Sequence, residues 1–157
     1  MNSTSESALS LRAAESSDAA LVLSWQQAAG VREHFRVQRP PQVNEHARWF
    51  SNRLNQDEPF FWLIESGDTP VGFIRLDPVK NEFDTFEVAI VIAPELQGEG
   101  IGSWAISQLR SRFPHFTLLA DVEPENEASR RAFEKAGFLR KSGRMMISKS
   151  SVNDVNE

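Results

Sequence analysis

The sequence lacks cysteine, and this absence excludes several kinds of chemistry. Disulfides, thiolate zinc sites and a cysteine acyl-enzyme intermediate all require a thiol, so a chain with 0 cysteines among 157 residues can use none of them. Tyrosine is absent as well, although 11 phenylalanines and 4 tryptophans keep the aromatic content at an ordinary 10%. Catalysis by this chain therefore has to proceed without a thiol and without a phenolic hydroxyl group.

Long apolar runs and an excess of positive charge are also missing. No run approaches the ~20 apolar residues that a membrane-spanning helix needs. Residues 1–7 are polar and have neither the basic nor the apolar region of a secretory signal. These features predict a cytoplasmic protein with no membrane partner. The formal net charge of −5 argues against a nucleic-acid partner, because neutralising phosphates normally needs a basic face.

The amino-acid composition and the length are those of a single folded domain. Hydrophobic residues make up 40% and charged residues 25% of the chain, which is typical of a globular protein. A chain of this length suits one core rather than two. We therefore expect one domain over residues 1–157, with flexible ends at residues 1–7 and 150–157, no metal site, and either a monomer or a homodimer.

Hydrophobic periodicity predicts alternating strands and helices. Strands are expected at residues 8–13, 60–64, 71–76, 86–92 and 116–121, with one or two more from Phe138 on, including residues 145–147. Helices are expected from the caps at residues 16–18 to residue 28, and at residues 44–54, 100–112 and 126–136. The strand at 86–92 is almost continuously apolar, so it should be central and buried on both faces. The fold class is therefore mixed α/β.

A glycine-rich turn joins this apolar strand to the next helix, in the pattern Gln97-x-x-Gly100-x-Gly102. Glycines let the backbone approach an anion, and the free amides at a helix start carry partial positive charge, so the turn suits a phosphate or pyrophosphate. A dinucleotide fingerprint would need a third glycine where Ser103 stands, and no Gly-Lys-Ser/Thr follows as in a Walker loop. An ordinary strand-to-helix loop is the structural alternative.

With Pro94 and the apolar strand before it, this turn resembles the acetyl-CoA motif of the GNAT superfamily, Arg/Gln-x-x-Gly-x-Gly/Ala. A second block, Asn126-x-x-Ser129-x-x-x-Phe133-x-Lys-x-Gly-Phe, resembles that superfamily's Asn-x-x-Ala/Ser-x-x-x-Tyr-x-Lys-x-Gly-Phe element. The resemblance covers about residues 60–138. It implies a mixed, mostly antiparallel central sheet that splays between the fourth and fifth strands, flanked by about four helices. It also implies acetyl-CoA as the co-substrate.

The resemblance further implies a set of cofactor contacts. Backbone groups of Ile90 and Ile92 would pair with the pantetheine amides, and the turn would bind the pyrophosphate. The implied cofactor-binding residues are Ile90, Ile92, Gln97, Gly98, Glu99, Gly100, Ile101, Gly102, Ser103, Asn126, Ser129 and Phe133. Several have structural alternatives: Asn126 is a good helix cap, Ser103 suits a helix start, and Gly137 with Phe138 packing on Phe133 fits a Schellman stop.

Transfer of an acetyl group to an amine requires a proton acceptor and stabilisation of an oxyanion. Glu87 is the one ionisable residue inside the central strand, where burial would raise its pKa, so it is a candidate base. It can instead pair with Arg75 across the sheet, and Asp84 with a water relay is a further alternative. Backbone amides near Ile92 suit the oxyanion. Phe133 stands where the family usually has a tyrosine that protonates or hydrogen-bonds the departing thiolate. Without it, solvent, Ser129 or a protonated acceptor would have to do so.

His46 is the remaining catalytic candidate. The stretch Glu45-His46-Ala47-Arg48-Trp49-Phe50 is similar to sugar-nucleotide N-acetyltransferases of the pseudaminic-acid type. That resemblance implies a small amine-bearing acceptor, namely an amino sugar carried by a nucleotide. A basic or aromatic pocket near Trp49 and the arginines at positions 32, 36 and 39 would favour this acceptor. His34 lies in the same region. The alternatives are ribosomal-protein alanine acetyltransferases, whose first helix also contains a tryptophan, and a non-catalytic acyl-CoA-binding regulator.

Overall fold

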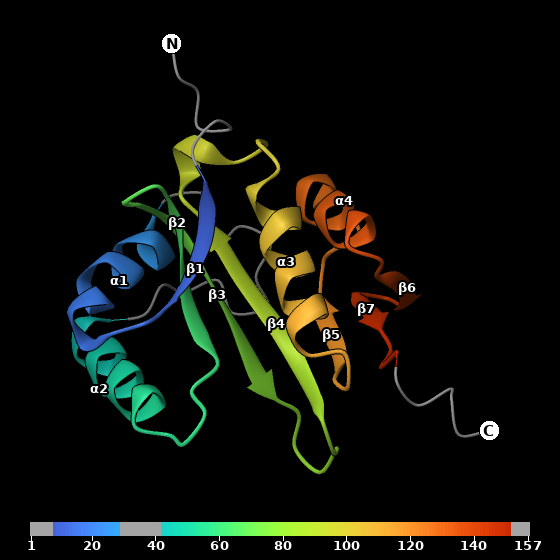
Figure 1. The fold of residues 1–157 in the computed structure, drawn as a ribbon, viewed down its shortest axis with the longest axis horizontal. Helices are drawn as coiled ribbons and strands as arrows, with labels where there is room; N and C mark the ends of the chain where they lie inside the picture. Colours follow the sequence, from blue (N-terminus) through green and yellow to red (C-terminus); the bar gives the residue numbers. More distant parts are fainter. Residues whose placement is uncertain (1–7, 29–41, 152–157) are drawn as a thin grey trace. The chain divides into compact units, whose positions relative to one another are not determined.

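The computed structural model describes residues 8–28 and 42–151. Four α-helices lie in this part of the chain, together with the seven strands of one hydrogen-bonded sheet (Figure 1). The strands are β1 (Leu9–Ala13), β2 (Phe61–Ser66), β3 (Thr69–Pro78), β4 (Thr85–Ile92), β5 (Thr117–Asp121), β6 (Leu139–Ser142) and β7 (Met145–Ser148). The helices are α1 (Ala19–Gln27), α2 (Val43–Leu54), α3 (Ile101–Arg112) and α4 (Glu127–Lys135), with short 3-10 turns η2 (Ser16–Asp18) and η3 (Pro94–Leu96).

The strand order is β1-β2-β3-β4-β5-β7-β6, which places β4 fourth of the seven. The pairs β1–β2, β2–β3, β5–β7 and β6–β7 are antiparallel, whereas β4 and β5 are parallel. The parallel ladder joins residues 85–87 to residues 117–119, so it involves only the first part of β4. The prediction of a mixed α/β, mostly antiparallel fold is confirmed, and the short ladder agrees with the expected splay between the fourth and fifth strands.

Contacts divide the chain into two compact units. The first unit takes residues up to Arg75 together with Ile90–Glu99, and the second takes Leu76–Ala89 and the residues from Gly100 on. Strands β3 and β4 therefore contribute residues to both units.

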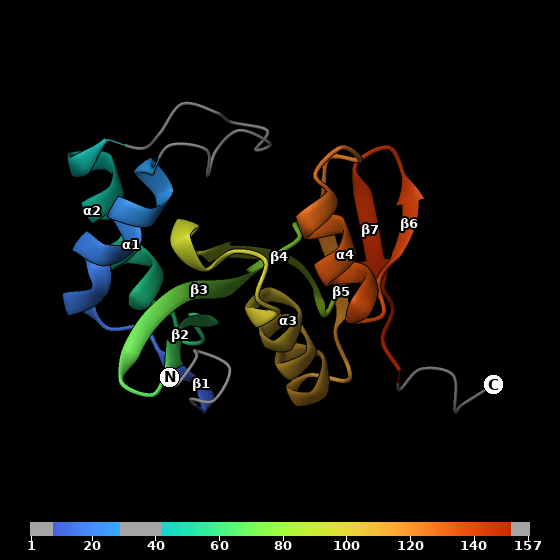
Figure 2. The same cartoon turned by 90° about the horizontal axis from the view of Figure 1, so that it is seen from above.

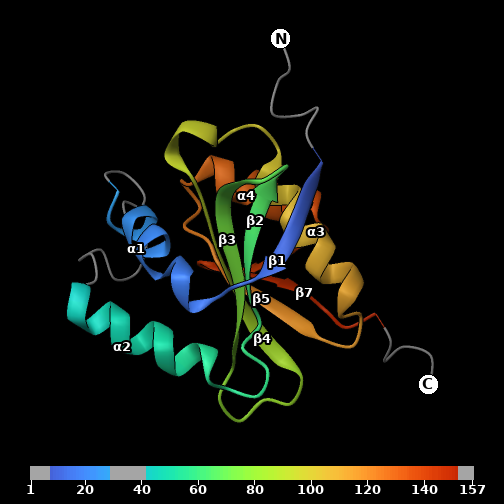
Figure 3. The ribbon, with the colours of Figure 1, turned by 60° about the vertical axis from the view of Figure 1, so that its left-hand side comes forward.

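In the first unit, α1 and α2 pack on the β2–β3 hairpin (Figure 3). The buried cluster combines side chains from both helices and from three strands, and Leu63 and Phe73 within it are completely buried. Burying a side chain of this size stabilises the fold by about 1.5–3 kcal/mol. The cluster consists of Val22, Trp25, Phe50, Phe61, Leu63, Phe73, Val91 and Ala93.

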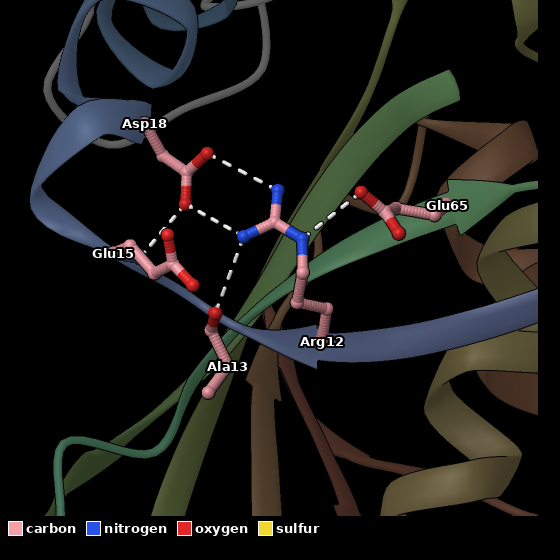
Figure 4. A network of polar contacts seen from close by, with 5 residues as sticks. All are labelled: Arg12, Ala13, Glu15, Asp18 and Glu65. Atoms are coloured by element: carbon pink, nitrogen blue, oxygen red, sulfur yellow. Dashed lines mark hydrogen bonds and ion pairs between the residues drawn. The ribbon is translucent and has the colours of Figure 1, made fainter. Parts of the chain in front are cut away.

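A polar network fixes the start of α1 to the sheet of this unit (Figure 4). The guanidinium of Arg12 on β1 donates to both carboxylate oxygens of Asp18, at 3.0 and 3.1 Å, and to Glu65 on β2 at 2.9 Å. Asp18 also accepts the backbone amide of Glu15 at 2.7 Å. Burial alone would raise the pKa of Asp18, but these hydrogen bonds outweigh it and the net shift is downward. The hydrogen bonds to Asp18 and Glu65 raise the pKa of the Arg12 guanidinium.

Gly72 on β3 allows a close approach of the backbone of β4. A Cβ at this position would lie 2.5 Å from the carbonyl oxygen of Val91 and 3.1 Å from the Cα of Ile92. The amide of Ala93 donates to the carbonyl of Val71 at 2.9 Å in the same place. The end of β4 is thus held against β3 because residue 72 has no side chain.

In the second unit, β5, β7 and β6 form an antiparallel set, and α3 packs against α4 (Figure 2). Arg110 of α3 connects the helix to its surroundings, because its guanidinium donates to Ser148 of β7 and to the carbonyls of Phe113 and Phe116. Its burial lowers the pKa of the guanidinium. Ser150, which the sequence assigns to a flexible tail, is buried and hydrogen-bonds through its amide to Thr117.

The sequence overestimates the burial of β4. Thr85, Val88 and Val91 are buried, but Ile90 and Ile92 are only half-buried. The expectation of burial on both faces is therefore wrong for Ile90 and Ile92, which lie beyond the part of β4 that is paired with β5.

Candidate active site

The glycine-rich turn has the local geometry expected of an anion-binding loop. After η3, Gly98 and Gly100 adopt positive φ angles of 88° and 86°, and nothing lies within 4 Å of a Cβ built on either. The left-handed backbone therefore favours glycine, since L side chains rarely adopt it. Gly100 is also the N-cap of α3, and no side chain in residues 8–28 or 42–151 caps that helix. The first amides of α3 consequently lack a capping side chain and carry partial positive charge.

Ser103 lies in the first turn of α3 and its hydroxyl donates to the carbonyl of Gly100 at 3.2 Å. This bond supports the structural interpretation of Ser103 as a helix-start hydroxyl. Since a hydroxyl has two acceptor lone pairs as well as its proton, the bond does not use up its capacity for hydrogen bonding.

At the end of β4 the peptide groups have a defined direction. The amide of Ala93 points to Val71 on β3, and in a trans peptide the carbonyl of Ile92 must point the opposite way. The carbonyl of Val91 approaches β3 at Gly72, so the amide of Ile92 points away from β3 as well. Ile92 thus presents both its N–H and its C=O on the edge of β4 opposite β3.

The side chain of Gln97 reaches back to this edge. Its Nε2 donates to the carbonyl of Ile92 at 3.3 Å, in an exposed position. Both residues belong to the first unit, and the bond closes the segment that contains η3. The sequence alone did not indicate this contact, because it depends on the fold of the turn.

The second motif forms the start and the end of α4. Asn126 caps the helix, since its side-chain oxygen accepts the amide of Ser129 at 3.2 Å. Gly137, with φ 98°, ends it: its amide donates to the carbonyl of Glu134 and the amide of Phe138 donates to the carbonyl of Phe133, both at 3.0 Å. These two bonds are the Schellman pattern. Both structural predictions are confirmed.

Phe133 itself is 3% exposed, and its ring meets that of Phe138 edge to face at 5.0 Å. The aromatic ring is therefore part of the packing beneath α4. Its hydrophobic contact with Phe138 is the one that usually accompanies this helix stop.

His46 lies on α2 and is almost completely buried in the first unit, at 4% exposure. Its ring stacks on Phe50 at 5.7 Å and contacts Trp49 at 5.5 Å. Burial, and then the positive charge of Arg75, lower the pKa of the imidazole below its ordinary value. The imidazole is therefore neutral at physiological pH. Its Nε2 is buried and has no hydrogen-bond partner among the described residues.

Arg75 of β3 lies next to the same aromatic side chains. Its guanidinium carbon is 5.1 Å from the centroid of Trp49 and 6.0 Å from that of Phe73. Cation–π contact of this kind holds an arginine on an aromatic face. The sequence presented Arg75 only as a partner for Glu87, so its position beside His46 and Trp49 is new information from the fold.

Glu87 is half-buried on β4, in the second unit, and is in register with Leu119 of β5. Asp84 immediately precedes β4, with φ 50°, and its carbonyl accepts the amide of Thr117 at 2.9 Å. Both carboxylates therefore lie at or near the paired start of β4. Their roles in proton transfer stay predictions.

The structure groups the candidate residues by unit. His46, Ile90, Ile92 and the turn residues 97–99 belong to the first unit, and Glu87, residues 100–103, Asn126, Ser129 and Phe133 belong to the second. The turn itself is continuous across Glu99 and Gly100. His34 and the arginines at positions 32, 36 and 39 lie outside the described residues.

Comparison with known proteins identifies the family. The family model of the acetyltransferase (GNAT) domain matches residues 8–139. The chain therefore belongs to this family of N-acetyltransferases, as the two sequence motifs predicted. A comparison with curated protein sequences found no match.

Solved structures of other acetyltransferases share the fold. Spermidine N-acetyltransferase from Vibrio cholerae, in complex with CoA and spermine, has a TM-score of 0.78 at 19% identity, covering 91% of this chain and 96% of that one. Aminoglycoside acetyltransferase AAC(6')-Ib, in complex with coenzyme A and kanamycin, has 0.74 at 18%, covering 90% and 95%. RimL, a ribosomal-protein alpha-N-acetyltransferase in complex with coenzyme A, has 0.75 at 14%, covering 92% and 93%. At these identities the likeness establishes the fold.

The described residues were also searched for membrane-spanning helices and for metal-binding groups. Within residues 8–28 and 42–151, no helix is both long and apolar enough to cross a membrane. The same part of the chain contains no group of three or more His, Cys, Asp or Glu residues that could hold a metal ion.

Proposed function

We propose that this chain transfers the acetyl group of acetyl-CoA to a primary amine by direct attack within a ternary complex. The observation that carries the proposal is the orientation of Ile92, whose N–H and C=O both lie on the edge of β4 opposite β3. An extended ligand with amide groups can pair with such an edge as another strand would. Pantetheine contains two amides, and we assign Ile90 and Ile92 to them.

The pyrophosphate is assigned to the turn that follows. Residues 97–103 include two glycines with positive φ and the uncapped start of α3. Their backbone amides suit phosphate oxygens without any basic side chain. On the second motif, Asn126 and Ser129 are assigned to the arm of the cofactor, a role that can coexist with the capping bond between them.

In the reaction, the neutral amine attacks the thioester carbonyl, a C–N bond forms and the C–S bond breaks. The amine proton passes to a base, and the coenzyme A thiolate receives a proton. The amide of Ile92 is assigned to the developing oxyanion. Glu87 is the proposed base, because it places a carboxylate on β4, the strand whose backbone is assigned to pantetheine, and a carboxylate can accept the amine proton. Ser129 is the proposed donor near the thiolate.

His46 is proposed to contact the acceptor rather than to compete with Glu87 as the base. A buried nitrogen without a partner is costly, and within the described part of the chain Nε2 of His46 is in this position. Since its imidazole is neutral, it can offer a hydrogen bond without adding charge. This makes His46 a candidate for orienting the amine.

A nucleotide-linked amino sugar is the proposed acceptor. The support is local chemistry: Arg75, Trp49 and His46 give the first unit a cationic and aromatic cluster. Such a cluster suits phosphate and base groups and disfavours the polycations that some structural relatives bind, such as spermine and kanamycin. A protein N-terminus is the second candidate, since RimL shares the fold.

An acceptor panel tests this proposal. Acetyl-CoA consumption and product mass would be followed with UDP-linked amino sugars, free amino sugars, spermidine and an alanine-starting peptide. Transfer to the nucleotide-linked sugar is expected. Acetylation of the peptide alone would select the second candidate, and tight acetyl-CoA binding without transfer to any amine would identify an acyl-CoA-binding regulator.

A further inference from the structure

The hydrogen bond from Gln97 to Ile92 occupies an atom that the proposed cofactor position requires. The carbonyl of Ile92 points away from β3 and would accept an amide N–H of pantetheine. In the structure it accepts the side-chain amide of Gln97 instead, at 3.3 Å. The side-chain amide of Gln97 therefore occupies the acceptor that an amide N–H of pantetheine would use.

We infer that Gln97 is an internal competitor for pantetheine, displaced when the cofactor binds; this inference rests on the proposed function. The bond is exposed and long for an N–H···O contact, so it can open readily. Once released, the side chain lies in the glycine-rich turn with a free amide. Gln97 thus acts as a positioning residue that keeps the end of β4 and the turn together until acyl-CoA replaces its bond.

The competition has a measurable consequence. A ligand must break the internal bond before it can form its own, so its apparent affinity is the intrinsic affinity multiplied by the fraction of molecules in which the bond is open. For one exposed hydrogen bond the expected effect is ~2–5-fold. Only ligands that contain pantetheine should show it, since the nucleotide part does not contact Ile92.

The test compares Gln97→Met with wild type. Methionine keeps the length of the side chain and removes the donor. Calorimetry would measure the affinities of CoA and of 3′-phospho-ADP, which retains the pyrophosphate and lacks pantetheine. The ratio of CoA affinity to nucleotide affinity should rise ~2–5-fold. Using the ratio removes any contribution of Gln97 to pyrophosphate binding, because that contribution affects both ligands. Gln56→Met, at an exposed position after α2, is the matched control and should leave the ratio unchanged.

A spectroscopic measurement gives a second, independent readout. The side-chain NH₂ signal of Gln97 can be identified by its loss in Gln97→Met. It should move toward the position of a free amide when CoA is added, and much less with 3′-phospho-ADP. If the affinity ratio is unchanged and the NH₂ signal of Gln97 responds equally to both ligands, the inference about Gln97 is wrong, while the proposed function stands. Failure of the wild-type protein to bind CoA would overturn the proposed function as well.

Discussion

The amide of Phe138 donates a 3.0 Å hydrogen bond to the carbonyl of Phe133, and the two rings meet edge to face. This relationship fixes Phe133 beneath α4, at the position where the family motif usually has a tyrosine. The ring has the expected place in the helix stop, but the hydroxyl group that would serve the departing thiolate is missing.

Replacement of Phe133 by tyrosine should therefore restore a proton donor. Phe133→Tyr is expected to keep CoA affinity and to raise turnover, with an upper bound of ~10²–10⁴-fold from general acid catalysis. Thiol release under saturating acetyl-CoA measures it. Phe116→Tyr, which adds the same hydroxyl to a half-buried ring elsewhere in the second unit, is the control. Equal or lower turnover in a folded Phe133→Tyr protein would mean that another group already protonates the thiolate or that no transfer occurs.

The ion pair between Arg12 and Asp18 predicts a loss of stability in acid. The pKa of Asp18 is lower in the folded state than in the unfolded state, where it is about 3.9. Its contribution is therefore present above that unfolded value and is lost as the pH falls through the folded value. Asp18→Asn should reduce the free energy of unfolding by about 1–2 kcal/mol at pH 7.

Urea unfolding of both proteins between about pH 7 and pH 2 measures this effect. The difference between wild type and Asp18→Asn should shrink toward the acid end of the range. Asp68→Asn, at an exposed position in the β2–β3 turn, should show little difference throughout. A constant difference for Asp18→Asn would contradict a role for its charge.

How well the sequence predicts each feature depends on the range of the interactions behind it. The cap at Asn126 and the stop at Gly137 need only neighbouring residues, and both were predicted. The burial of His46 and the close approach at Gly72 depend on segments far apart in the chain. A glycine inside a strand is a signal for such an approach, but the sequence does not say which strand comes close. The same limit explains why the Gln97 bond was missed.

His46 should make the stability of the protein depend on pH in a different range. Its pKa is lower in the folded state than the ordinary 6.5 of the unfolded chain. Protonation therefore favours the unfolded state, and stability falls as the pH drops below about 6.5. His46→Phe removes both this effect and the unpartnered nitrogen, so it should be more stable than wild type, with a larger advantage at pH 5 than at pH 8.

Chemical unfolding at the two pH values provides the comparison, with His115→Phe at an exposed loop position as the control. The control should show no pH-dependent advantage. If wild type and His46→Phe lose stability in parallel on acidification, the imidazole is not held neutral by its surroundings.

The most direct measurement of the central claim is CoA binding to two glycine variants. Gly100 and Gly67 have positive φ angles of 86° and 60°, and a Cβ on either would meet nothing within 4 Å. Gly100→Val and Gly67→Val therefore impose a similar backbone cost, but only the first places a side chain in the turn assigned to the pyrophosphate. Calorimetry should show CoA affinity lost in folded Gly100→Val and retained in Gly67→Val. Equal CoA affinity in both folded variants would contradict the position assigned to acetyl-CoA.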